Sequence, residues 1–290
     1  MPVGDSNVPL EARHKMERAV TALFVPGNRP DRFDKALGAK PDVIIIDWED
    51  AVGSDEKNEA RSQTLQWSLS HPKAQDRVVI RINPVGTDEF SSDMEAITSL
   101  IKAKVNPIPA ILVAKAESGP SLEKLVKLCD RRVIVCALIE SAAGLNAVSE
   151  IASVSGVERL AFGALDFSLD TGMDPGPDVM AYARQRLVLA SRVAGIQAPL
   201  DSPETSIVDT ESIYLSAVTA KRFGMTGKLC IHPNQIQYVK KGFRSSPEQI
   251  AWARSVIGAG NDASQIDGKM VDRPVIERAR KILESLEEPR

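Results

Sequence analysis

The chain has 290 residues, 43% of them hydrophobic and 26% charged, which is typical of a globular protein with a large core. Its 36 Lys and Arg against 39 Asp and Glu give a net charge of -3, which argues against a nucleic-acid or membrane-surface binder. Its apolar runs all fall short of the roughly 18 residues of a membrane span. Because Cys129, Cys136 and Cys230 lie in apolar surroundings and cannot all pair, we expect a reducing, cytoplasmic setting.

Short apolar runs alternate with segments of helical periodicity along most of the chain. Such runs, without internal polar alternation, are typical of a parallel sheet covered by helices. Eight strand–helix units predict an α/β fold, a (β/α)₈ TIM barrel, and a doubly wound sheet is the alternative. The predicted strands lie at 20–25, 43–47, 77–82, 110–114, 132–139, 158–163, 195–200 and 227–231.

The pattern changes after the eighth strand. Ser246 and Pro247 are typical of a helix start, a polar stretch follows, and a last helix begins near Pro274. We therefore expect an N-terminal extension at 1–18, a catalytic barrel at 19–244 and a C-terminal helical segment at 245–290 outside the barrel.

Charged and polar residues directly follow most of the predicted strands. In a barrel these positions share one face, where active sites lie. So many charges at one end are costly unless they are paired or bound to a metal, so the sequence predicts a site there. The residues are Asp47, Glu49 and Asp50 after the second strand, Arg81 and Asn83 at the third, Lys115 after the fourth, Glu140 after the fifth, Asp166 after the sixth and His232 after the eighth.

Glu140 and Asp166 follow neighbouring strands and form the predicted metal site. Two carboxylates with positions left for water and substrate suit Mg²⁺. Three histidines and the absence of a CxxC motif argue against a zinc-type site. The alternative is that each carboxylate caps the helix that follows it.

Arg81 ends an apolar strand and needs an anionic partner, since burying its charge alone is costly. A substrate carboxylate would match its planar fork, and a salt bridge to Asp47 or Glu49 is the alternative. The two acids could themselves orient metal-bound water or lie in a solvated loop.

Two further cationic features have competing interpretations. Arg29, Arg32 and Lys35 stand three residues apart around a predicted helix start, which suits phosphate binding or a solvated basic face. Lys115 could form a Schiff base with a keto substrate, but nearby carboxylates should hold its pKa up.

Six motifs carry a resemblance to a known family: LFVPGNRPDRFDKAL, VIIIDWEDAV, VIRINPVGT, ALIESAAGL, LAFGALDFSLD and GKLCIHPNQI. In this order they resemble the citrate lyase β-subunit-like family of the HpcH/HpaI aldolase group, which includes malyl-CoA and citramalyl-CoA lyases. The resemblance spans about residues 20–285. It implies a TIM barrel with a C-terminal lid, Mg²⁺ (Mn²⁺ is the alternative ion), and cleavage or formation of a carbon–carbon bond in a 3-hydroxyacyl-CoA.

The resemblance also implies roles for single residues. The C-terminal lid would bring an acid/base, Asp272, to the site of a neighbouring subunit in a homo-oligomer (trimer or hexamer), with Asp47 or Glu49 as substitutes. Glu140 and Asp166 resemble the metal ligands and substrate contacts. The resemblance also implies that Arg81 binds the keto acid. It implies that Phe24, Arg29 and Lys35 contact CoA, and that Leu165, Ile231 and His232 line the pocket.

Two departures from the family pattern leave the acyl group open: Trp48 replaces a small aliphatic residue, and Ala143 stands where many relatives carry arginine. The expected partners are an acyl-CoA, of citryl-, citramalyl- or malyl-CoA type, and a small keto acid. One alternative is a class II aldolase that acts on free hydroxy-keto acids. The other is a β subunit that depends on an acyl-carrier protein within a larger citrate lyase complex.

Overall fold

The computed structural model describes residues 15–103, 110–130, 132–259, 265–266 and 269–287. It divides into two compact units, Met1–Phe243 and Arg244–Arg290. Most of the expected N-terminal extension, residues 1–14, lies outside the described residues. Among the helices described, none combines the length and the apolarity that a membrane crossing needs.

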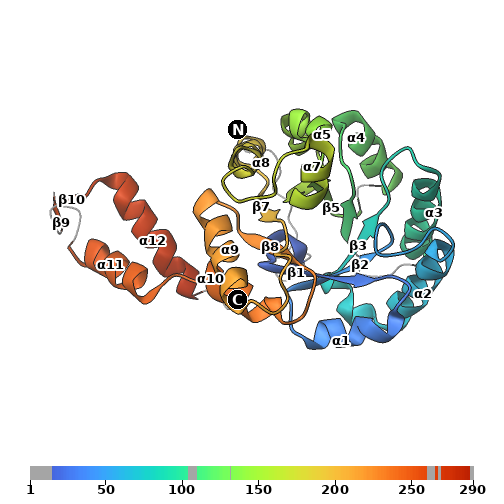
Figure 1. Ribbon diagram of the computed structural model, residues 1–290, viewed down its shortest axis with the longest axis horizontal. Helices are drawn as coiled ribbons and strands as arrows, with labels where there is room; N and C mark the ends of the chain where they lie inside the picture. The colour runs from blue at the N-terminus through green and yellow to red at the C-terminus, as the bar shows by residue number, and fades with distance from the viewer. Residues whose placement is uncertain (1–14, 104–109, 131, 260–264, 267–268, 288–290) are drawn as a thin grey trace. The chain divides into compact units, whose positions relative to one another are not determined.

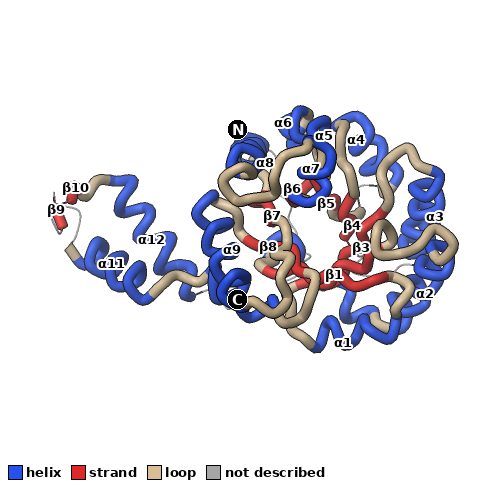
Figure 2. Tube along the Cα trace, viewed as in Figure 1, coloured by secondary structure: helices blue, strands red, loops and turns tan. Residues whose placement is uncertain are grey.

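The first unit is a closed barrel of eight parallel strands in sequential order, with helices around it (Figures 1 and 2). Each predicted strand is present near its expected bounds, so the TIM barrel is confirmed and the doubly wound alternative is wrong. The strands are β1 Thr21–Pro26, β2 Val43–Asp47, β3 Val78–Ile82, β4 Ala110–Val113, β5 Val135–Ile139, β6 Val157–Phe162, β7 Gln197–Asp201 and β8 Gly227–Cys230.

Helices follow the strands and form the outer layer of the barrel (Figure 2). The α-helices are α1 Phe33–Gly38, α2 Lys57–Ser70, α3 Asp88–Lys102, α4 Gly119–Leu128, α5 Ala142–Asn146, α6 Val148–Ala152, α7 Ala164–Thr171, α8 Ala181–Ala194, α9 Thr210–Phe223 and α10 Gln235–Phe243. The described residues also include the short 3₁₀ helices η2 Lys15–Arg18, η3 Pro30–Arg32 and η4 Pro72–Arg77.

Alternate strand residues build two separate cores. In β2, Val43 and Ile45 belong to the barrel interior, whereas Ile44 and Ile46 pack in the layer between strands and helices. The free thiols divide likewise, with Cys136 in the interior and Cys129 and Cys230 in the outer layer. Burial raises the pKa of Cys136 and of Cys230 to about 12.

A buried arginine lies at the amino end of the barrel. The Arg159 guanidinium donates to the carbonyl oxygens of Met16, Ala19 and Ala198 at 2.8–2.9 Å, and to the hydroxyl of Thr226. Burial lowers the pKa of Arg159 to about 10, because these partners carry no net charge. At this end of the barrel, backbone carbonyl groups therefore accept most of the hydrogen bonds of the buried guanidinium.

The second unit contains α11 Pro247–Gly258, the short antiparallel pair β9 Gln265–Ile266 and β10 Lys269–Met270, and α12 Arg273–Glu287. Ser246 and Gln249 form a capping box at the start of α11, which confirms the predicted helix start. Ala253 and Val256 of α11 pack with Ala279 of α12 in a small core of this unit.

Candidate active site

The carboxyl ends of β2 and β3 place Asp47 directly beside Arg81, since the two are register partners. Arg81 Nε lies 2.7 Å from Asp47 Oδ1, and Nη2 lies 2.6 Å from Oδ2. Arg81 Nη1 lies 2.8 Å from Glu49 Oε2, and the ring of Phe24 lies 4.9 Å from the guanidinium carbon. Burial would lower the pKa of Arg81, but the carboxylates, Asp47 first, outweigh it and raise that pKa. Both salt-bridge partners that the sequence left open are thus engaged.

The first residues of the loop after β2 fold back onto the strand, although the loop is exposed from Asp50 onward except at Val52. Asp47 and Glu49 are buried, and the Asp47 carboxylate accepts the backbone N–H groups of Glu49 and Ala51. Burial raises the pKa of Glu49, and the positive charge of Arg81 opposes that rise. The interpretation of these acids as a solvated loop is therefore wrong.

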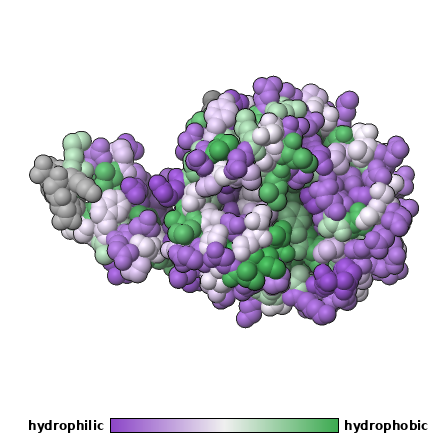
Figure 3. Space-filling view, viewed as in Figure 1, coloured by the Kyte–Doolittle hydropathy of each residue, from purple (hydrophilic) through white to green (hydrophobic). Residues whose placement is uncertain are grey.

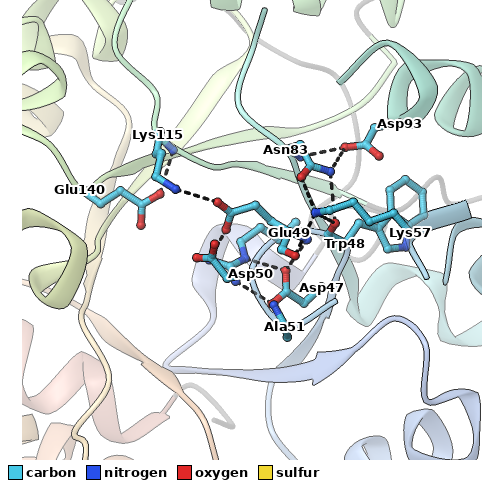
Figure 4. Close-up of polar contacts among 11 residues, drawn as sticks. Asp47, Trp48, Glu49, Asp50, Ala51, Lys57, Asn83, Asp93, Lys115 and Glu140 are labelled. Carbon is cyan, nitrogen blue, oxygen red and sulfur yellow. Dashed lines mark hydrogen bonds and ion pairs between the residues drawn. The ribbon is translucent and has the colours of Figure 1, made fainter. Parts of the chain in front are cut away.

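The buried side chain of Lys57, for which the sequence predicted no role, holds this loop in place (Figure 4). Lys57 Nζ donates to the carbonyl oxygens of Trp48 and Glu49 at 2.9 and 3.0 Å, and to Asn83 Oδ1 at 2.7 Å. Asn83 in turn donates to Asp93, which pairs with Arg61 at 2.6 Å. The four-residue spacing of Lys57 and Arg61 on α2 was the available sequence signal, because it places both on one helix face.

Lys115 and Glu140 lie on the other side of Glu49 (Figure 4). The backbone N–H of Lys115 donates to Glu140 Oε1 at 2.8 Å, and Lys115 Nζ lies 3.0 Å from Glu49 Oε1. Burial acts to lower the pKa of Lys115, but the hydrogen bond and charge of Glu49 raise it overall. A protonated amine is a poor nucleophile, which disfavours the Schiff-base alternative.

Glu140 is a buried carboxylate with few compensating contacts. Desolvation raises its pKa to about 8, the backbone N–H of Lys115 opposes the rise, and the charges of Glu49 and Asp166 add to it. Ser141, not Glu140, caps α5 through the N–H of Gly144, so the capping interpretation of Glu140 is wrong.

Asp166 lies in the first turn of α7, close enough for its charge to raise the Glu140 pKa. Gly163, just before that helix, makes room for Glu140: a Cβ there would lie 2.6 Å from Glu140 Oε2. Within the described ranges no group of three or more His, Cys, Asp or Glu has metal-binding placement. Glu140 and Asp166 thus stay a predicted pair of metal ligands, without a third His, Cys, Asp or Glu grouped with them in the described residues.

The predicted phosphate-binding corner is an exposed cluster at the start of α1. Arg29 pairs through two nitrogens with Asp31 at 3.0 and 3.1 Å, and Lys35 Nζ lies 3.8 Å from the same carboxylate. The two cations that were predicted to bind a phosphate therefore share the carboxylate of Asp31. Arg32 is exposed as well.

The other predicted pocket residues are also solvent-accessible. Leu165 is 49% and Ile231 46% exposed, and apolar side chains gather over α7 in Figure 3. His232 is exposed and accepts the N–H of Asn234 through Nδ1. Gln235 accepts the N–H of Ile231 and fixes the end of β8.

The two departures from the family pattern have different surroundings. Trp48 is fully buried and donates from its indole nitrogen to Thr64 on α2 at 2.9 Å. It belongs to the core under that helix. Ala143 is exposed on α5.

Asp272 belongs to the second unit and is exposed. Its side chain accepts the backbone N–H of Val275 at 3.2 Å, which caps the first turn of α12. Its carboxylate thus has a helix-capping contact besides the predicted acid/base role.

A model of the HpcH/HpaI aldolase/citrate lyase family matches residues 20–233. The chain belongs to this family. Among its relatives, a citrate lyase subunit beta-like protein of Mycobacterium tuberculosis is 34% identical over 271 residues, covering 90% of this chain and 93% of that protein. The mitochondrial citramalyl-CoA lyase of Rattus norvegicus is 28% identical over 300 residues, with 94% and 87% covered.

The chain has the same fold as solved structures at about 30% identity. CitE of Mycobacterium tuberculosis, in complex with magnesium, acetoacetate and coenzyme A, superimposes with a TM-score of 0.82 at 32% identity. The match covers 93% of this chain and 99% of that one. The family resemblance read from the six motifs is therefore confirmed.

Proposed function

We propose that this chain is an Mg²⁺-dependent lyase that cleaves or forms a carbon–carbon bond in a short 3-hydroxyacyl-CoA of citryl-, citramalyl- or malyl-CoA type. The observation that carries the proposal is the buried carboxylate of Glu140 directly after β5, with Asp166 in the first turn of α7 after the neighbouring strand β6. The names of the relatives and the magnesium, acetoacetate and coenzyme A bound by CitE support this reaction class.

Glu140 and Asp166 would hold the metal ion. Their hard oxygen donors suit Mg²⁺ or Mn²⁺, and a divalent cation would offset the uncompensated charge that raises the Glu140 pKa. Water and substrate would fill the other positions. When bound, the ion supplies Lewis-acid polarisation of the keto-acid carbonyl.

The chain's own residues would move the protons. In cleavage, Glu49 or Asp47 takes the proton of the C3 hydroxyl, the keto acid departs, and the enolate of acetyl-CoA remains. The buried Arg81 holds positive charge next to these carboxylates and the departing keto acid. Asp272, supplied by a neighbouring subunit of a homo-oligomer, would protonate the acetyl carbon.

The coenzyme would bind at the exposed corner formed by Phe24, Arg29 and Lys35. A CoA phosphate carries more charge than the Asp31 carboxylate and would displace it from the two cations.

The three free, buried cysteines support the predicted reducing, cytoplasmic setting.

The test is a screen of malyl-, citramalyl- and citryl-CoA with the purified chain, in Mg²⁺ and in a chelator. We expect one thioester to give acetyl-CoA and a keto acid only with Mg²⁺, and Glu140→Gln to abolish that turnover. Full activity in the chelator would contradict the metal dependence of the proposal. Turnover of free hydroxy-keto acids alone, and only with Mg²⁺, would contradict the thioester substrate and favour the class II aldolase.

A second candidate is the carrier-dependent β subunit, which the name of the Mycobacterium tuberculosis relative favours. This candidate predicts little turnover of CoA thioesters by the isolated chain. It also predicts activity with the same acyl group on an acyl-carrier protein, so adding that substrate to the screen separates the two.

A further inference from the structure

Two cations pair with the Glu49 carboxylate, and they differ in how many of their donors are already used. Arg81 directs Nε and Nη2 at Asp47 and Nη1 at Glu49 and Asp50, at distances of 2.6–3.5 Å. Lys115 makes one side-chain contact among the described residues, to Glu49. Since an ammonium carries three N–H donors, Lys115 has donors left for an incoming anion.

The position of Lys115 is set by an unusual backbone conformation. Its φ is +45°, in the left-handed region that side chains other than glycine seldom adopt. In this conformation its N–H donates to Glu140 while its Nζ reaches Glu49, so the residue bridges both groups of acids (Figure 4). Such outliers persist where surrounding contacts hold them, often at functional sites.

Accessibility also separates the two cations. The Lys115 side chain is 41% exposed, whereas that of Arg81 is 9% exposed and lies against the Phe24 ring. A ligand can therefore reach the lysine without breaking the two-point pair of Arg81 and Asp47. A lysine is also a compact charge on a flexible stem, so it can turn from Glu49 to a second carboxylate.

We propose that Lys115 is a substrate-binding residue whose ammonium binds the carboxylate of the keto acid, or the equivalent carboxylate of the acyl-CoA. This inference rests on the proposed function, which requires a keto acid at this site. Arg81 then supplies fixed positive charge, and Lys115 supplies the direct hydrogen bonds. The amine stays protonated, so no covalent bond forms.

The test measures binding of pyruvate, glyoxylate and oxaloacetate by calorimetry in the presence of Mg²⁺. We expect Lys115→Met to weaken the keto acid bound by the wild type about 10- to 100-fold, the range of a charge-assisted hydrogen bond. Lys115→Arg should restore most of the affinity, and Lys124→Met, which removes an exposed lysine on α4, should change nothing. Lys115→Gln serves as a second neutral variant.

An uncharged analogue separates binding from a loss of site shape. Pyruvamide lacks the carboxylate, so its affinity should be equal in wild type and Lys115→Met. An unchanged keto-acid affinity in Lys115→Met and Lys115→Gln, an equal loss for pyruvamide, or no keto-acid binding by the wild type would overturn the inference. Keto-acid binding that depends on Lys115 in a chain that turns over no thioester would refute the proposed function alone.

Discussion

Arg159 and Arg81 are both buried in the same barrel, at opposite ends, yet they are stabilised by different partners. At the amino end, three backbone carbonyls and a hydroxyl surround Arg159, and burial lowers its pKa to about 10. At the carboxyl end, Asp47 and Glu49 surround Arg81, and its pKa is raised. The difference shows that uncharged backbone and hydroxyl groups stabilise the arginine at the amino end. At the carboxyl end the partners are charged, so a charged ligand can interact with them.

The largest expected effect comes from removing each arginine in turn. Arg81→Met should lower kcat/KM roughly 10²–10³-fold, because it removes charge stabilisation at the site. Arg159→Met should leave the kcat of the folded enzyme near wild type but lower the free energy of unfolding by about 3 kcal/mol, because buried carbonyls lose their donors. Kinetics and denaturant unfolding of both variants measure this, and equal losses of activity would contradict the comparison.

A matched pair of glycines sharpens the same contrast. A Cβ on Gly163 would meet the Glu140 side chain at 2.6 Å, whereas a Cβ on Gly227 would meet the Ala19 carbonyl oxygen at 2.6 Å. The same Cβ would lie 2.7 Å from Glu140 Cβ, so Gly163→Ala should displace the proposed metal ligand, lower kcat about 10²-fold and destabilise the fold by about 1–2 kcal/mol. Gly227→Ala should destabilise the fold by about 2–3 kcal/mol.

A folded Gly163→Ala enzyme with the wild-type kcat would contradict this prediction, because displacement of the Glu140 side chain would then not affect the reaction. The unfolding midpoint of each variant, measured beside its kcat, keeps site and fold effects apart.

The third prediction concerns pH, and it belongs to the carboxyl end. The Glu140 pKa is raised to about 8 in the folded chain from 4.5, so between these values the folded state holds a proton that the unfolded state has lost. Without metal, this group should lower stability as pH rises through that window, with a limiting slope of about 1.4 kcal/mol per pH unit. Urea unfolding of wild type and Glu140→Gln in a chelator between pH 5 and 8 measures the difference. If the difference in the free energy of unfolding between the two proteins did not change with pH, the raised pKa of Glu140 would be contradicted.

The smallest effect is expected at the exposed rim. Arg29→Ala and Lys35→Ala should raise the KM for the CoA thioester several-fold with little change in kcat, because their proposed contacts lie far from the reacting atoms. Asp31→Asn should lower that KM, since it removes the competing carboxylate. The KM effects should shrink as salt is added. An unchanged KM in all three variants would identify the corner as a solvated basic face.

The barrel and the face that carries the site were predictable from the sequence. The strands are almost wholly buried apolar runs, and parallel topology brings the residues after them, such as Asp47 and Glu140, to one end. The pairing of Arg81 with Asp47 could be named as an alternative but not decided, because it depends on the register of β2 and β3.

Other features of the site depend on loop geometry that no periodicity reveals. The hydrogen bonds of Lys57 join two loops and a helix, and the direction of the Trp48 side chain follows from the turn after β2. The left-handed φ of Lys115 likewise has no composition signal, since the residue is not glycine. The contact of Asp31 with Arg29 could have been predicted, because the two residues are only two positions apart in the sequence.

The reactivity of the buried cysteines can be used to measure local opening of the barrel. Cys136 lies in the barrel interior and Cys230 in the layer outside it, and burial holds the pKa of each thiol near 12. A thiol reagent attacks the thiolate, so modification of either requires an opening that exposes it to water. Labelling rates at the two sulfurs, resolved by mass spectrometry, therefore compare loosening of the helical shell with opening of the strand cylinder, without any introduced probe.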